Sequence, residues 1–259
     1  MYAAELAAQR AEAAASAAAP PPPPCAASPP ALAHVAPGLS YCAAFLSGAE
    51  AASLTAVIDA LPASEWAALT KRRLLNLGGV PHPSGSWAEP LPEALVAAVA
   101  PRLAALGVSF DQVLLNEYRN GAGIGGHKDG PLFLPRAAIV SLGGDAVLHF
   151  SQAPAGPPCA SVLLRAGSLV VFEGEAYTGL YHYIEDGGAE ALGGGVVNLA
   201  ESGARLGDVV ARPPRRLSLT LRRLANVQRV FTRFQAVPAD VEEERRRRKL
   251  WWLASISEK

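Results

Sequence analysis

The chain has 259 residues and a mass of 26.9 kDa, and 50% of its residues are hydrophobic. This length can bury a sizeable core, as one all-β or α/β domain or as two smaller domains. The 23 basic and 23 acidic residues give a net charge of zero, which excludes a generally basic nucleic-acid coat and an acidic solvating chain. The sum hides an uneven distribution, because residues 1–200 hold 9 basic and 16 acidic residues, whereas residues 201–259 hold 14 and 7.

The residues 1–36 form a low-complexity leader. An Ala-rich stretch precedes the run Pro20–Pro24 and the pair Pro29-Pro30, and such a segment has little to pack against. We therefore expect disorder with local polyproline II character, and ordered structure from near Gly38.

Three features bear on the compartment of the protein. Charges, Pro or Gly interrupt every apolar run before the roughly eighteen residues needed to cross a bilayer, so we expect no membrane association. Cys25, Cys42 and Cys159 are odd in number and widely spaced, which indicates a reducing compartment without a disulfide framework or zinc site. Glu5 and Glu12 lie where a secretory signal would carry basic residues, so we expect no secretory signal. We expect the nucleus, the cytoplasm or both, and an Ala-rich organelle transit segment is the alternative.

Two helices are predicted ahead of the strands. Ser47 followed by Glu50 matches a capping box, and apolar residues at helical spacing continue until Pro62. A second helix is predicted over residues 91–106, with Gly107 on its C-cap side.

From Gln112 onward, short apolar runs of strand length alternate with Gly and Pro. The predicted strands are Val113–Tyr118, Ala138–Leu142, Ala146–Phe150, Val162–Leu164, Leu169–Phe172, Leu180–Ile184 and Arg216–Arg222. Gly143-Gly144-Asp145 predicts a hairpin turn between two of them. Residues 185–214 are Gly-rich with little periodicity and are predicted to be a long loop. Many short strands behind two helices predict an antiparallel sandwich or barrel with helical support.

The C-terminal residues predict one more helix. Asp240 and Glu243 can cap a helix that runs to Trp252. Its basic run 245–249 follows the acidic run 242–244, and this order favours ion pairs on an exposed helix over nuclear targeting or RNA contact. We expect Trp251 and Trp252 to anchor the helix to the body.

Gly121, Gly123 and Gly126 match the GxGxxG pattern of dinucleotide-binding loops. That pattern must open a helix, whereas the residues that follow here, His-Lys-Asp-Gly-Pro, cannot begin a regular helix. We expect these glycines to permit a tight, irregular approach to His127 and Asp129.

His127 and Asp129 lie two positions apart, so an extended segment can aim both side chains the same way, and a polar loop is the alternative. His182 shares a predicted strand face with Leu180 and Ile184. It is either a core histidine or the third ligand of a mononuclear iron site, in which two imidazoles and one carboxylate leave positions open for substrate and oxygen. Both interpretations fit the local pattern.

Strict alternation over residues 216–222 places leucines on one strand face and polar residues on the other. The polar residues are Arg216, Ser218, Thr220 and Arg222. This face either meets water at a sheet edge or lies inside a barrel, where the guanidinium groups would bind a dicarboxylic acid well. Asn116 and Tyr118 share another strand face and add neutral hydrogen-bonding groups.

Taken in chain order, these motifs resemble the AlkB family of iron(II)- and 2-oxoglutarate-dependent dioxygenases. The motifs are Asn116-Glu117-Tyr118, His127-x-Asp129, a distal His182, and Arg216 with Arg222 six residues later. The runs at residues 73–83, 127–132 and 175–178 are similar to the homologue 6 branch. The resemblance covers residues 38–225, and four ordered elements are far more specific than any one of them.

The resemblance implies a mainly β protein with flanking helices, a double-stranded β-helix (a distorted jelly roll) supported by N-terminal helices. The chain would then consist of the disordered leader over residues 1–36, a dioxygenase domain over 37–235 and a C-terminal basic helix over 236–259. It further implies that His127, Asp129 and His182 bind Fe(II) and form the catalytic centre. Arg216 would pair with the distal carboxylate of 2-oxoglutarate, and the pocket for this cosubstrate would be completed by Asn116, Tyr118, Ser218, Thr220 and Arg222.

The implied activity is the oxidative demethylation of alkylated RNA or DNA by a monomer. In this family, O2 and 2-oxoglutarate are consumed, succinate and carbon dioxide form, and a hydroxylated N-methyl group leaves as formaldehyde. Two alternatives share the fold: a module that binds methylated RNA with little turnover, and a protein hydroxylase or demethylase with the same iron centre.

Substrate contacts are less clearly marked than the iron site. Four aromatic residues could stack a flipped base, and core packing is the alternative for each of them. They are Tyr41, Trp66, Trp87 and Tyr177. The run Lys71-Arg72-Arg73 either contacts phosphates near the mouth of the active site or lies in a solvated loop or sheet edge. We assign no role to His34, His82 or His149.

Overall fold

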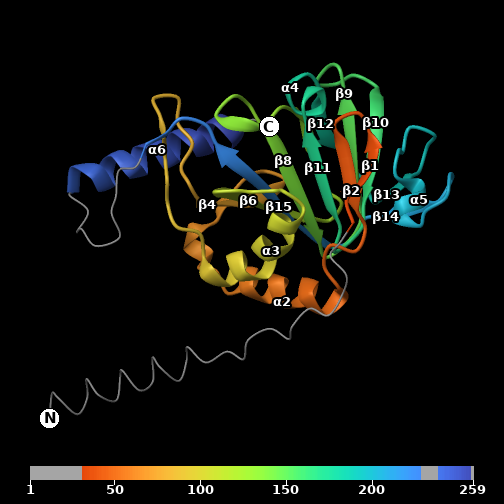
Figure 1. Cartoon of the computed structure of the whole chain (residues 1–259), viewed down its shortest axis with the longest axis horizontal. Helices are drawn as coiled ribbons and strands as arrows, with labels where there is room; N and C mark the ends of the chain where they lie inside the picture. Colours follow the sequence, from red (N-terminus) through yellow and green to blue (C-terminus); the bar gives the residue numbers. More distant parts are fainter. Residues whose placement is uncertain (1–30, 229–238, 258–259) are drawn as a thin grey trace, which may run out of the picture.

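The computed structural model describes residues 31–228 and 239–257. An eight-stranded antiparallel sheet forms the larger half of the fold, with the strand order β1-β2-β11-β8-β15-β6-β4-β3 (Figure 1). Its strands are β1 (Ala33–Ala36), β2 (Leu39–Cys42), β3 (Ala67–Ala68), β4 (Arg72–Gly78), β6 (Gln112–Arg119), β8 (Phe133–Leu142), β11 (Leu169–Glu173) and β15 (Arg215–Leu224).

A four-stranded antiparallel sheet packs against the first, in the order β10-β9-β12-β7. Its strands are β7 (Ile124–His127), β9 (Ala146–Ser151), β10 (Pro158–Leu164) and β12 (Tyr181–Ile184). Both sheets contribute to one buried cluster, in which Ile139 and Phe172 of the first sheet lie with Phe150 of the second. Two facing antiparallel sheets of this kind form the predicted jelly roll, so the expected mainly β fold with flanking helices is confirmed.

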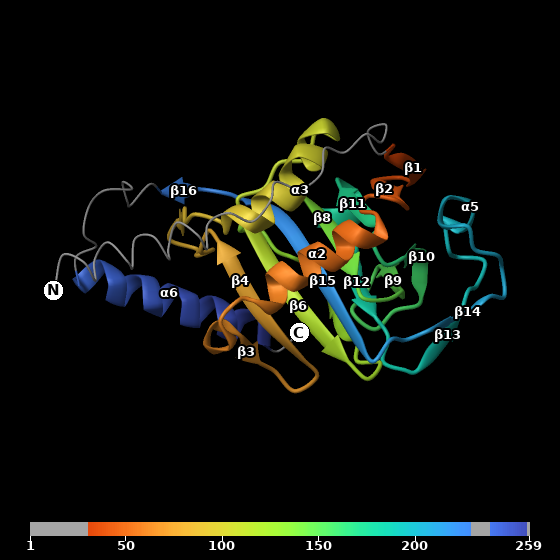
Figure 2. The ribbon, with the colours of Figure 1, turned by 90° about the horizontal axis from the view of Figure 1, so that it is seen from below.

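Two helices cover the outer face of the first sheet (Figure 2). Helix α2 (Gly48–Asp59) begins at the predicted capping box, in which the Ser47 hydroxyl accepts from the backbone N–H of Glu50 and the Glu50 carboxylate accepts from that of Ser47. Helix α3 (Glu93–Ala105) ends before Gly107, whose φ of +68° suits glycine. Leu54 of α2 and Leu95 of α3 pack in the cluster that lines this face.

Ordered structure begins earlier than expected. Residues 33–36, predicted as part of the leader, form β1 and pair with β2. The reversal between the two strands is tight because Gly38 adopts a φ of +70°, and a Cβ there would lie 2.4 Å from the carbonyl oxygen of Glu173. The prediction of disorder for residues 1–30 falls outside the described residues.

The predicted hairpin at Gly143-Gly144-Asp145 is wrong. The turn joins β8 to β9, but these strands belong to different sheets, since β8 pairs with β11 and β15 while β9 pairs with β10 and β12. A local turn signal shows where the chain reverses, whereas the packing of two apolar faces decides which strands pair.

The predicted loop over residues 185–214 also contains regular structure. Strand β13 (Ala189–Ala191) pairs with β14 (Val209–Ala211), and the short helix α5 (Leu199–Ser202) lies between them. Residues of the segment 185–214 pack on the outer side of the second sheet, where Leu192 and Val210 lie in one cluster with Leu163. Elements of three or four residues are too short to produce a visible periodicity.

The remaining elements are short or terminal. They are the 3₁₀ turn η1 (Ala63–Glu65), β5 (Ser86–Trp87), which pairs in parallel with β16 (Val227–Gln228), helix α4 (Glu175–Thr178) and the C-terminal helix α6 (Ala239–Ser257). In the described part of the chain, no helix is both long and apolar enough to span a membrane. Cys42 and Cys159 carry free thiols, and Cys25 lies outside the described residues.

Helix α6 contains the predicted ion pairs, of which that of Arg246 is exposed and that of Arg248 is largely buried. Arg246 pairs with Glu243 at 2.8 Å and Arg248 with Glu244 at 2.7 Å. Trp252 is 3% exposed and anchors the helix as predicted. Trp251 is 39% exposed, and its ring meets that of His82 edge to face with 4.9 Å between the centroids, so it contacts the body at the surface. One helical position places it about 100° around the axis from Trp252.

Candidate active site

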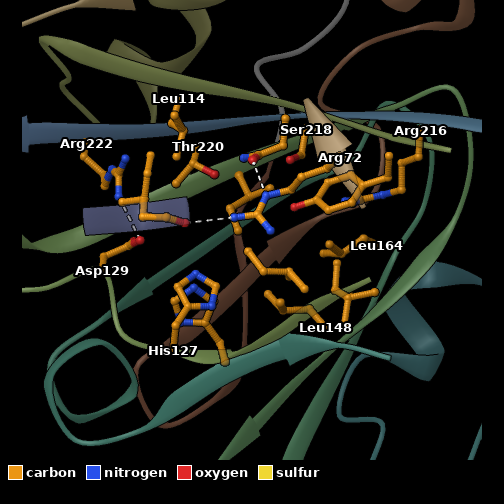
Figure 3. Close-up of a pocket in the computed structure, with 17 residues that line it drawn as sticks. Arg72, Leu114, His127, Asp129, Leu148, Leu164, Arg216, Ser218, Thr220 and Arg222 are labelled. Carbon is orange, nitrogen blue, oxygen red and sulfur yellow. Dashed lines mark hydrogen bonds and ion pairs between the residues drawn. The ribbon is translucent and has the colours of Figure 1, made fainter. Parts of the chain in front are cut away.

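A pocket between the two sheets is lined by all nine residues that the sequence predicts for the site (Figure 3). Their positions are Asn116, Tyr118, His127, Asp129, His182, Arg216, Ser218, Thr220 and Arg222. Strand β15 pairs with β8 on one side and β6 on the other, so it is a central strand, and its four polar residues line the pocket. The alternative of a solvated edge strand is therefore excluded.

His127, Asp129 and His182 converge at one point of the pocket. His127 ends β7 and lies directly opposite His182 of β12, with the ring centroids 4.3 Å apart. Asp129 follows two residues later, and one ligand atom from each of the three residues lies within 4.8 Å of the others. Asp129 and His182 are buried. Two imidazoles and one carboxylate at this spacing fit the donor set that non-haem Fe(II) prefers.

The tautomer of His127 is fixed by a backbone group. Its Nδ1 lies 2.8 Å from the carbonyl oxygen of Gly125, which can only accept a hydrogen bond. Nδ1 therefore carries the hydrogen, and the lone pair of Nε2 is left for a metal ion. A backbone carbonyl in this position is a common way to orient a histidine ligand.

The Gly-rich segment before His127 allows β7 to lie close to its neighbours. A Cβ on Gly123 would be 2.0 Å from the carbonyl oxygen of Ile184, and a Cβ on Gly126 would be 1.9 Å from that of Pro154. A larger residue at Gly123 would push the chain away from β12, and one at Gly126 would push β7 away from the segment around Pro154. The glycines thus serve the close approach predicted for them.

Arg222 is held against Asp129. Its Nη1 donates a hydrogen bond of 2.8 Å to Asp129 Oδ1 (Figure 3). Its Nε donates one of 3.0 Å to Gln112 Oε1. Gln112 lies opposite Arg222 in the pairing of β6 with β15. Gln112 was not predicted as a site residue, although it directly precedes the predicted strand 113–118 and lies on the strand that pairs with β15.

Arg216 lies elsewhere in the pocket, where its buried guanidinium faces Tyr118 at 5.5 Å from the ring centroid. Its Nε donates to Ser141 Oγ at 3.1 Å, while Nη2 is buried and has no hydrogen-bond partner within the described residues. Burial lowers the pKa of Arg216 to about 10. A buried cation with an unused donor is costly unless an anion joins it, so this end of the pocket fits the carboxylate of a ligand.

The three residues of the basic run Lys71-Arg72-Arg73 have different surroundings. Exposed Lys71 forms an ion pair with Asp186, Arg73 pairs with Glu117 at 2.8 Å, and only Arg72 enters the pocket. There the Nε of Arg72 donates to Asn116 Oδ1 at 3.2 Å. Side chains alternate along β4, so neither a phosphate-binding cluster nor a solvated loop describes the run.

None of the four aromatic residues considered for base stacking lines the pocket. Tyr41 lies in the core and Tyr177 stacks on Phe172, with 5.9 Å between their ring centroids. The guanidinium of Arg73 covers Trp66, and that of Arg248 covers Trp87. The structure therefore favours packing roles for all four.

Several residues of the pocket were not predicted from the sequence. Besides Arg72, the pocket contains Ile256 of α6 and the apolar residues Leu114, Ile124, Ile139, Leu148, Leu164 and Ile184. The apolar members lie on strands whose inward faces the alternation defines, but no local pattern marks Ile256.

Comparisons with known proteins agree with this geometry. Residues 59–222 match the family model described as the 2OG-Fe(II) oxygenase superfamily. A Danio rerio protein named "Probable RNA/DNA demethylase ALKBH6" is 33% identical over 208 residues, which cover 74% of this chain and 88% of that protein. The solved structure titled "The structure of OsALKBH1" is similar with a TM-score of 0.51 at 17% identity, over 74% of this chain and 100% of that one, and this likeness concerns the fold.

Proposed function

Because the chain belongs to the 2OG-Fe(II) oxygenase superfamily, we propose that it removes methyl groups from alkylated RNA or DNA by oxidation. It is an oxidoreductase, a dioxygenase that uses Fe(II), 2-oxoglutarate and O2. The convergence of His127, Asp129 and His182 within 4.8 Å carries the proposal.

In this proposal, Nε2 of His127, the carboxylate of Asp129 and the imidazole of His182 hold Fe(II). Iron held by these residues would supply, with O2 and 2-oxoglutarate, the oxidation of a substrate C–H bond. Arg222 holds the Asp129 carboxylate in position through its hydrogen bond of 2.8 Å.

Arg216 binds the distal carboxylate of 2-oxoglutarate with the donor that has no partner in the described structure. The pocket for 2-oxoglutarate is completed by Asn116, Tyr118, Ser218, Thr220 and Arg222. Arg216 and Ser218 are buried, and a buried environment strengthens an ionic contact with the cosubstrate.

The proposed substrate is supported by the Danio rerio relative, which is named a probable RNA/DNA demethylase. One oxygen atom of O2 enters succinate when 2-oxoglutarate loses carbon dioxide, and the other converts an N-methyl group to N-hydroxymethyl. This hemiaminal loses formaldehyde and leaves the demethylated base. We further propose that the protein acts as a monomer in the nucleus, the cytoplasm or both.

The test supplies purified protein with Fe(II), O2 and 2-oxoglutarate and measures succinate and formaldehyde. We expect formaldehyde with methylated RNA or DNA oligonucleotides and none with Asp129→Ala, whose fold is checked by circular dichroism. If only methylated peptides yield formaldehyde or a hydroxylated product, the protein is a protein oxygenase and the proposal is wrong. Tight binding of methylated RNA without succinate would replace it with a binding module.

A further inference from the structure

The C-terminal helix α6 lies outside residues 59–222, to which the family model matches, yet it contributes to the active-site pocket. The helix runs beside β4 at one margin of the first sheet (Figure 2). Ile256, in its last turn, lines the pocket, and the backbone carbonyl of Ile256 accepts a hydrogen bond of 3.3 Å from Nη2 of Arg72. The helix thus forms part of the pocket wall.

Contacts along its length fix α6 to the body. Arg245 pairs with Glu89 through two hydrogen bonds of 2.5 and 2.8 Å. The buried Arg248 donates to the carbonyl oxygen of Gly85 at 2.5 Å and to Ser84 Oγ at 3.1 Å. These contacts hold the helix in one register against the segment before α3.

The side chain of Trp252 lies against Arg222, the residue that hydrogen-bonds to Asp129 of the proposed iron site. The guanidinium carbon of Arg222 lies 4.0 Å from the ring centroid of Phe133 and 5.7 Å from that of Trp252. The two rings meet edge to face at 5.6 Å and 72°. The rings of Phe133 and Trp252, together with the hydrogen bond from Nε to Gln112, therefore limit the orientations that the Arg222 guanidinium can adopt.

We propose that Trp252 is a positioning residue for the iron-binding carboxylate. Trp252 holds Arg222, Arg222 donates to Asp129 Oδ1, and the carboxylate is thereby presented to the metal in one orientation. Partners that orient a metal ligand without touching the metal commonly change affinity 10- to 100-fold when removed. The inference rests on the proposed role of Asp129 as an iron ligand.

The test measures the affinity of the full chain for Mn(II), used as a redox-stable substitute for Fe(II), by calorimetric titration in the presence of 2-oxoglutarate. Trp252→Leu keeps an apolar side chain but removes the aromatic face, and we expect Mn(II) affinity to fall about 10-fold. Trp252→Phe should stay within about 3-fold of the original chain, because it restores an aromatic face. Trp251→Leu is the matched control, since Trp251 contacts His82 at the surface, and it should leave the affinity unchanged.

A double-variant cycle shows whether Trp252 acts through Arg222. If it does, adding Trp252→Leu to Arg222→Met causes little further loss of Mn(II) affinity, whereas an equal loss in both backgrounds would overturn the inference. Unchanged affinity in the single variant Trp252→Leu would overturn it as well. Circular dichroism checks the fold, and Trp252→Met, whose flexible side chain repacks readily, replaces Trp252→Leu if that variant unfolds. Failure of the original chain to bind Mn(II) would count against the proposed iron site itself.

Discussion

Nη1 of Arg222 donates a hydrogen bond of 2.8 Å to Oδ1 of Asp129, and only 2% and 6% of the two side chains are exposed. This pair joins the centre of the first sheet to the residues that follow β7 of the second. Such a pair contributes little net stability, because both charges lose their hydration, but removal of one partner leaves a buried charge without compensation.

Arg222→Met should therefore lower the free energy of unfolding by about 3–5 kcal/mol. Urea denaturation measures the change. Arg136→Met is the matched control, since the 3.1 Å pair of Arg136 with Glu173 lies at the surface and should contribute at most about 1 kcal/mol. If both variants lose a similar free energy of unfolding, burial does not make the loss of Arg222 more costly than the loss of a surface partner.

Arg216→Met should weaken 2-oxoglutarate binding about 100-fold, since loss of a buried charge pair typically costs at least about 2–3 kcal/mol. Arg216 and Asp129 are not bonded to each other in the structure, so Mn(II) affinity should change little. Calorimetric titrations of the metal and of 2-oxoglutarate separate the two effects. A variant that binds 2-oxoglutarate normally would remove Arg216 from the proposed pocket.

Metal binding should stabilise the chain against heat. At 100 times its dissociation constant, Mn(II) should add about 2.7 kcal/mol and raise Tm by roughly 5–10 °C. His182→Ala should lose this shift because one of three ligands is gone. His149→Ala should keep it, since His149 is a buried histidine that hydrogen-bonds to Ser161 at 2.9 Å, outside the pocket. Differential scanning calorimetry with and without Mn(II) distinguishes these outcomes.

Glu117 should make stability depend on pH. Burial raises the pKa of Glu117, but hydrogen bonds from Arg73, Arg215 and Arg119 outweigh it and lower the pKa to about 2. The folded pKa lies below the unfolded value of about 4.3, so the stabilisation is complete at neutral pH and is lost as the pH falls from about 4 toward 2.

Glu117→Gln should therefore cost about 1–3 kcal/mol at pH 7, less than the full pKa shift implies because its arginine partners are partly exposed. The difference from the original chain should shrink below pH 4. Urea denaturation at several pH values tests this, with Glu173→Gln as a surface control. If the difference in unfolding free energy between the two proteins stays constant down to pH 3, the lost stability comes from packing and not from the charge of Glu117.

Local signals in the sequence determined much of the fold. The capping box at Ser47 and Glu50 marks the start of α2, and Gly107 marks the end of α3, because both depend on backbone geometry within a few residues. Each of the seven predicted strands matches one of β6, β8, β9, β10, β11, β12 and β15, and only the start at Leu180 lies one residue outside its strand. The partners of these strands could not be read in the same way, as the turn at Gly143 shows, because pairing depends on contacts between residues far apart in the chain.

The sequence by itself determined which residues form the candidate site: the spacing of His127 and Asp129 and the alternation after Arg216 are local patterns, and the resemblance links them to His182. Only the tertiary structure decided that the polar face of β15 is buried, because this depends on the second sheet, whose residues line the same pocket. It also decided the contacts of Gln112, Arg72 and Trp252 with the site. Each is an ordinary residue in its own segment, and long-range packing alone brings it to the residues of the pocket.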